Sequence, residues 1–75
     1  DLLKINFSVT ENANYKIAIY DMVGKALLEK NLGHINAGAQ EIELSTKSYN
    51  LPSGAYILSL IKNNERKSNK VFTVN

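Results

Sequence analysis

The feature that most constrains the fold is a proline–glycine corner that leads directly into the longest apolar run of the chain. The corner spans residues 51–56 (LPSGAY), and the apolar run continues as ILSLI over residues 57–61. Pro52 holds its φ angle at about −65°, and Gly54 tolerates the left-handed backbone that a tight turn requires. We therefore expect a rigid corner followed by a long strand, residues 55–62, that is central in its sheet and partly buried on both faces.

Alternation of apolar and polar residues marks most of the remaining chain as half-buried strands. The alternating segments are residues 2–9, 15–20, 39–45 and 66–74. Turn-forming residues separate the segments. They predict loops at residues 10–14 and 33–38, an irregular crossing at residues 47–50, and a two-residue hairpin at Asn63 and Asn64.

Residues 21–24 (DMVG) have the composition of a type I turn. The carboxylate of Asp21 can accept a backbone N–H, and Gly24 tolerates a positive φ at the fourth position. The following segment, residues 25–32, is predicted to return as the second strand of a hairpin. Good helix formers within residues 23–30 leave two helical turns as the alternative. The segment also leaves open whether Leu27 or Leu28 faces the core.

Short strands separated by turns predict an all-β fold, an immunoglobulin-like or fibronectin-like antiparallel β-sandwich of six or seven strands. The 75 residues are expected to form a single domain, residues 1–75, cut from a longer secreted protein. Since the chain has no cysteine, its core has no disulfide to support it.

Composition argues against two classes of partner. The net charge of +2 is too small to indicate nucleic-acid binding, and no apolar run approaches the length of a membrane-spanning helix. The C-terminal hairpin is more basic than the rest, with Lys62, Arg66, Lys67 and Lys70 against Glu65. An ordinary solvated face explains such a run as readily as a recognition surface does.

Residues suited to catalysis are few. His34, the single histidine, lies in the predicted glycine-bounded loop without a serine or cysteine signature. Glu41 and Glu43 share the predicted solvated face of a strand, where paired acids are ordinary. Asp21 is already explained by its turn, so we expect no catalytic residue, metal site or cofactor.

The tyrosines indicate packing more than sugar binding. Tyr15 and Tyr56 fall on predicted core faces, and Tyr20 and Tyr49 remain candidates for exposure. Tyr56 follows a corner in the manner of sandwich folds that tie a tyrosine hydroxyl back to the backbone.

The segments YDMVGK (residues 20–25) and LPSGAY (residues 51–56), followed by a basic hairpin and KVFTV (residues 70–74), resemble the C-terminal sorting domains of the type IX secretion system of Bacteroidetes. The resemblance extends from Phe7 to Asn75. It departs from the family in lacking the usual opening Asn-Pro segment and a terminal lysine or arginine. The positions that match the family are Asp21, Gly24, Pro52, Gly54 and Tyr56, with Lys67 and Lys70 in the terminal hairpin.

The resemblance implies a non-catalytic secretion signal. Such a domain directs a fused cargo from the periplasm through the type IX outer-membrane translocon, and a sortase-like peptidase at the cell surface usually removes it. The cargo then stays at the outer-membrane surface or is released. The terminal strand and its lysines are the expected contact surface, and an unpaired edge also makes weak self-association possible. The alternatives are an accessory fibronectin-like spacer or carbohydrate-binding module of a secreted hydrolase and, less favoured, a small enzyme.

Overall fold

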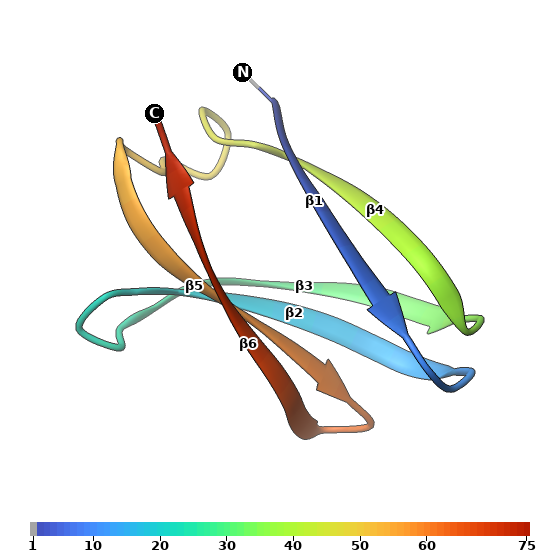
Figure 1. The fold of residues 1–75 in the computed structure, drawn as a ribbon. Helices are drawn as coiled ribbons and strands as arrows, with labels where there is room; N and C mark the ends of the chain where they lie inside the picture. Colours follow the sequence, from blue (N-terminus) through green and yellow to red (C-terminus); the bar gives the residue numbers. More distant parts are fainter. Residues whose placement is uncertain (1) are drawn as a thin grey trace.

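A computed structural model describes residues 2–75, apart from the side chain of Lys67, and arranges them as strands joined by turns (Figure 1). The six strands are β1 (Leu2–Val9), β2 (Ala13–Asp21), β3 (Ala26–Ile35), β4 (Gly38–Ser45), β5 (Gly54–Lys62) and β6 (Glu65–Val74). The described residues include no helix long and apolar enough to cross a membrane.

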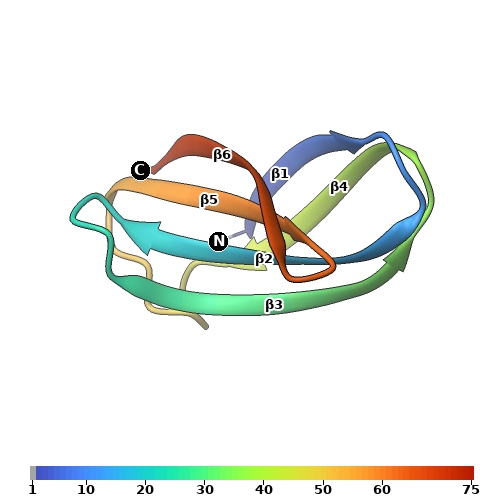
Figure 2. The ribbon, with the colours of Figure 1, turned by 90° about the horizontal axis from the view of Figure 1, so that it is seen from below.

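The strands form two antiparallel sheets that face one another (Figures 1 and 2). The larger sheet has the order β3-β2-β5-β6, and β1 pairs with β4 in the smaller sheet. The predicted all-β antiparallel sandwich is therefore confirmed, with six strands. Hairpins join β2 to β3 and β5 to β6. The pairs β1–β4 and β2–β5 bring together strands that are not consecutive in the chain.

The core lies between the sheets. Its buried strand residues come from β1, β2, β4 and β5, and half-buried residues of β3 and β6 complete it. Ile17 and Ile19 of β2 are fully buried, and Leu44 of β4 is 1% exposed. Half-buried apolar side chains surround this centre: Leu3, Phe7, Leu28, Leu32, Ile35, Ile42, Phe72 and Val74. Leu28 packs on the core while Leu27 is 40% exposed, which resolves the choice of face in β3 and excludes the helical alternative there.

β5 has the central position predicted for it, between β2 and β6. Its inner residues Leu58 and Leu60 face the small sheet, while Ser59 and Ile61 on the outer face are 1% and 8% exposed. Asn63 and Asn64 adopt the positive φ angles of 49° and 69° that a two-residue hairpin demands, so this turn is also confirmed.

Three predicted loops differ in the structure. The loop predicted at residues 10–14 is shorter, because β2 begins at Ala13. β3 continues through Gly33, His34 and Ile35 because these residues pair with the start of β2, so the predicted loop shrinks to two residues. Residues 46–50 form a hydrogen-bonded turn in place of an irregular crossing. The amide of Leu51 donates to the carbonyl of Thr46 at 2.8 Å, and Asn50 takes a left-handed φ of 53°, a pattern that ordinarily closes a helical turn.

Candidate functional site

The turn that starts at Asp21 is held by its own carboxylate. Oδ1 of Asp21 accepts the backbone N–H of Val23 at 3.1 Å and that of Lys25 at 2.9 Å. The amide of Gly24 donates to the Asp21 carbonyl at 3.0 Å, and Gly24 has a φ of 94°. Both roles predicted for these residues are therefore seen, and both are structural: the carboxylate satisfies backbone donors, and the glycine supplies the backbone angle.

The Pro52 corner is closed by the tyrosine that follows it. The hydroxyl of Tyr56 donates to the carbonyl of Pro52, as expected for a tyrosine tied back to its own corner. Gly54 is the first residue of β5 and has a φ of 152°. The hydrogen-bonded turn lies earlier in the chain, at residues 46–50. The Tyr56 ring is 5% exposed and stacks on Phe72 of β6, with centroids 5.7 Å apart. The corner therefore supports the terminal strand directly.

These segments, distant in sequence, meet at one end of the large sheet. Asp21 pairs across β2 and β5 with Tyr56, and Tyr56 pairs across β5 and β6 with Phe72. Gly54 pairs with Val74 two positions further along the same strands. Residues of the two corners and of the last strand thus form one continuous row across three strands.

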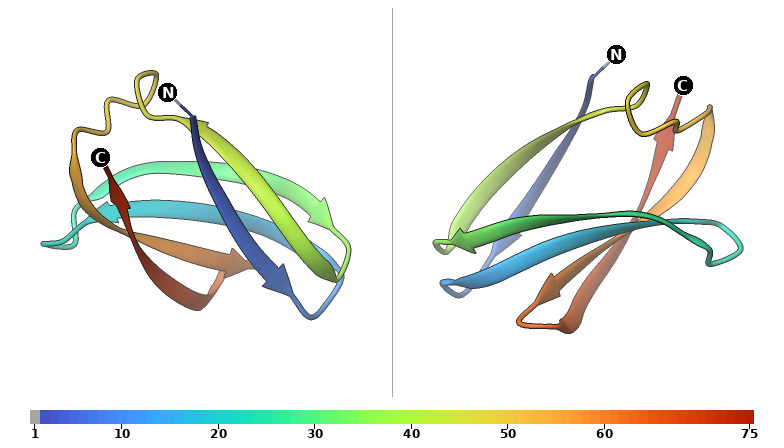
Figure 3. Two further views of the ribbon diagram at one scale, coloured as in Figure 1. Left: turned by 45° about the horizontal axis from the view of Figure 1, so that its top comes forward. Right: turned by 180° about the vertical axis from the view of Figure 1, so that it is seen from behind.

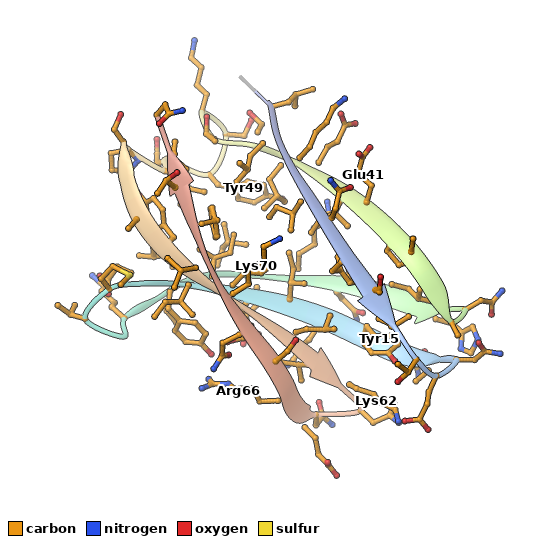
Figure 4. The ribbon with its side chains drawn as sticks, viewed as in Figure 1. Tyr15, Glu41, Tyr49, Lys62, Arg66 and Lys70 are labelled. Atoms are coloured by element: carbon orange, nitrogen blue, oxygen red, sulfur yellow. The ribbon has the colours of Figure 1, made fainter. Side chains whose placement is uncertain are left out.

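β6 forms an exposed edge beside this row. It pairs with β5 on one side and is the last strand in the order of the large sheet (Figure 3). Lys70 is exposed and points towards β1, where its Nζ lies 3.5 Å from the carbonyl oxygen of Asn6 (Figure 4). The side chain of Lys67 lies outside the described part of the chain. A basic, inward-pointing residue on an edge strand discourages pairing with another copy of the same edge.

One ion pair links distant parts of the chain near the opposite end of β5. Nζ of Lys62 donates to Oε1 of Glu11 at 2.5 Å, and Tyr15 next to it donates its hydroxyl to the Glu11 carbonyl at 2.8 Å. The hydrogen bond to the carboxylate raises the pKa of the Lys62 ammonium above its ordinary value, against the opposing effect of burial. This contact ties the β1–β2 connection to β5.

Comparison with protein families gives a match over the whole chain. Residues 1–75 match the family model of the secretion system C-terminal sorting domain. The chain belongs to this family. Comparison with curated proteins and with solved structures gives no match.

The sorting domain is therefore a type IX secretion signal, and its role is export of a cargo to the cell surface or the extracellular space. This role requires interaction with the secretion machinery and no chemistry by the domain itself. The resemblance inferred from the two corners and the terminal strand is confirmed.

The residues considered for catalysis or metal binding are dispersed in the sorting domain. His34 lies exposed in β3, and Glu41 and Glu43 lie on the exposed face of β4. Among the described residues no group of three or more histidine, aspartate or glutamate side chains is placed to hold a metal ion.

The tyrosines serve mainly as packing residues. Tyr15 and Tyr56 are buried, as predicted. Tyr20 is half-buried beneath the guanidinium of Arg66, while Tyr49 is 41% exposed in the turn before Pro52. The described tyrosines thus do not gather into the flat aromatic surface that a carbohydrate-binding module uses.

Some structural residues were missed by sequence reasoning. Asparagine tolerates the left-handed conformation that Asn50 adopts in its turn. The chain contains many asparagines, so this tolerance alone does not single out Asn50. The bond from Tyr15 to the Glu11 carbonyl repeats the four-residue spacing of Tyr56 and Pro52. The contact between Arg66 and Tyr20 joins residues 46 positions apart and has no local signal.

Proposed function

We propose that the type IX translocon recognises this domain through the exposed edge of β6. The observation that carries the proposal is the position of the terminal strand: it is an edge strand, and the two corners brace its C-terminal half. An edge strand offers unpaired backbone N–H and C=O groups to a partner's sheet. Exposed Lys70 adds positive charge beside these groups.

In this proposal the motif residues divide into two roles. Asp21, Gly24, Pro52, Gly54 and Tyr56 shape the corners and present β6, while Lys67 and Lys70 contact the machinery. The domain is the last, non-catalytic unit of a longer secreted protein. It carries its cargo out of the periplasm, and the surface peptidase of the system then removes it.

The decisive experiment is a fusion of residues 1–75 to the C-terminus of a periplasmic fluorescent protein, expressed in a bacterium with a functional type IX system. We expect the reporter at the cell surface or in the medium, and we expect that export to stop when the system is disabled. The same reporter without the domain is the control. Retention of the fusion in the periplasm of the competent strain would contradict the proposal.

A further inference from the structure

A pocket lies on the outer face of the large sheet, the face turned away from the small sheet. The proposed role of the β6 edge does not involve this pocket. Its volume is about 160 Å³. We call it the Arg66 pocket; it is lined by Tyr20, Gly24, Ile57, Ser59, Arg66 and Asn69. The strand register accounts for the grouping, because Tyr20 lies opposite Ile57 and Ser59 lies opposite Asn69.

A bulge in the β5–β6 pair creates this pocket. Arg66 and Asn69 are three positions apart, so in a regular strand they would face opposite sides of the sheet. The register shifts between Leu60 and Ile61, which lie opposite Ser68 and Arg66, so β6 contains one extra residue at this point. The extra residue turns Arg66 onto the same face as Asn69, in the way that bulges re-aim side chains.

Tyr20 holds the guanidinium of Arg66 in place. Nη2 of Arg66 donates to the Tyr20 hydroxyl at 3.0 Å, and Cζ lies 5.2 Å from the centroid of the Tyr20 ring. The two contacts orient the planar group and use one nitrogen of its fork. Arg66 and Lys70 point to opposite sides of β6 (Figure 4). The pocket is therefore a second surface, separate from the side of β6 that carries Lys70.

The side-chain amide of Asn69 adds further donors to the pocket. The hydroxyl of Ser59, which is 1% exposed, donates to Oδ1 of Asn69 at 2.7 Å. This bond uses the Asn69 acceptor and leaves the two amide N–H groups as donors. Within the described part of the chain, ion pairs join Lys16 to Glu29 and Lys62 to Glu11, and neither includes Arg66.

We propose that the Arg66 pocket binds a carboxylate, presented as an aspartate or glutamate side chain by a partner protein. The fork geometry of arginine matches the two oxygens of a carboxylate, and charge-assisted hydrogen bonds of this kind are about twice as strong as neutral ones. Ile57 supplies an apolar wall for the methylene groups of the side chain. A volume of about 160 Å³ suits one side chain, since sites for drug-sized ligands begin at about 300 Å³.

The test is an NMR titration of the isotope-labelled 75-residue domain with blocked aspartate (N-acetyl, N-methylamide), with its asparagine analogue, and with acetate. Blocked aspartate should give saturable shifts at the Arg66 Nε–H and the Asn69 side-chain amide, and the asparagine analogue should not. Equal affinity for acetate would assign the site to any free carboxylate. Tighter binding of blocked aspartate would assign it to a side chain. Equal shifts from the acid and its amide would overturn the proposal.

Two pocket variants and one control variant make the result specific. Arg66→Gln should weaken binding by about tenfold or more, whereas Lys4→Gln removes the same charge from an exposed position of β1 and should leave binding unchanged. Asn69→Asp keeps an acceptor for Ser59 but adds a negative charge to the pocket, so it should fold and lose affinity. Parent-like binding by a folded Arg66→Gln or Asn69→Asp variant, or equal losses in Arg66→Gln and Lys4→Gln, would overturn the proposal.

Discussion

At the scale of single residues, two tyrosine hydroxyls close loops in the same way. Tyr15 and Tyr56 are both buried, and each donates to the carbonyl of the residue four positions earlier, Glu11 and Pro52 respectively. A buried tyrosine needs a partner for its hydroxyl, and the nearby backbone supplies it without a second side chain. Each bond therefore fixes the entry of the chain into a strand.

Replacing Tyr56 with phenylalanine tests this role. Tyr56→Phe keeps the ring that stacks on Phe72 but leaves the Pro52 carbonyl without its donor. We expect the free energy of unfolding to fall by about 1 kcal/mol, the usual net value of such a bond. Urea unfolding measures this, with Tyr49→Phe at an exposed position as the control. An equal effect of the two substitutions would contradict the role assigned to the corner.

A substitution at Gly54 tests the effect of backbone conformation separately from that of packing. Its φ of 152° is rarely adopted by residues with a side chain, yet an added Cβ would have no atom within 4 Å. Gly54→Val should therefore destabilise the domain mainly through backbone strain, by about 1–3 kcal/mol. Urea unfolding again gives the measurement. A stability equal to that of the parent would show that β5 can begin without the positive φ.

At the scale of elements, β6 combines a supported inner face with an exposed edge. Phe72 and Val74 pack against the core, while Val71 on the other face is 60% exposed. Besides its pairing with β5 and these apolar contacts, the strand is held by the contacts of Arg66 with Tyr20 and of Asn69 with Ser59. The exposed charge of Lys70 contributes little to folding, because exposed charges are well solvated.

Substituting Lys67 and Lys70 together separates folding from recognition. The double variant Lys67→Ala and Lys70→Ala should unfold in urea within about 0.5 kcal/mol of the parent, but export of the fluorescent fusion should be impaired. Substitution of Lys4 and Lys47, two exposed lysines away from β6, provides the matched control for lost charge. Unimpaired export of the Lys67 and Lys70 variant would remove both lysines from the recognition surface.

At the scale of the whole molecule, two strands cover a sheet of four, so much of the core is only partly enclosed. Half-buried apolar residues surround the small group of fully buried ones. A chain of this size buries about 60% of the surface of its unfolded form and is correspondingly marginal in stability. The contact between Lys62 and Glu11 joins two segments that are distant in the sequence.

The ion pair of Lys62 predicts a specific response to alkaline pH. Its pKa is raised above the ordinary value of 10.5, chiefly by the hydrogen bond to Glu11. A raised folded-state pKa gives stability that is complete below the unfolded value and is lost as the pH rises through the folded value. The difference in unfolding free energy between the parent and Lys62→Met should thus stay constant up to about pH 10.5 and shrink above it.

Urea unfolding of both proteins across this range measures the difference. A difference that stays constant or grows at high pH would contradict the assigned direction of the pKa shift.

The sequence by itself determined the strands, the main turns and the family. Alternation of apolar residues is a local property, and the backbone demands of Asp21, Gly24, Pro52 and the Asn63–Asn64 hairpin are carried by the residues themselves. Tyr56 was predicted for the same reason, since its partner is four positions away. These features can be predicted without knowing how the two sheets pack.

Only the tertiary structure decided which residues share a surface. The row of Asp21, Tyr56 and Phe72 depends on the pairing of three strands, and the choice of Leu28 over Leu27 depends on the small sheet opposite. The Arg66 pocket depends on a bulge that reverses the face of one side chain. A shift of one residue in register moves every later side chain to the other face, and the periodicity of a single strand contains no information about that shift.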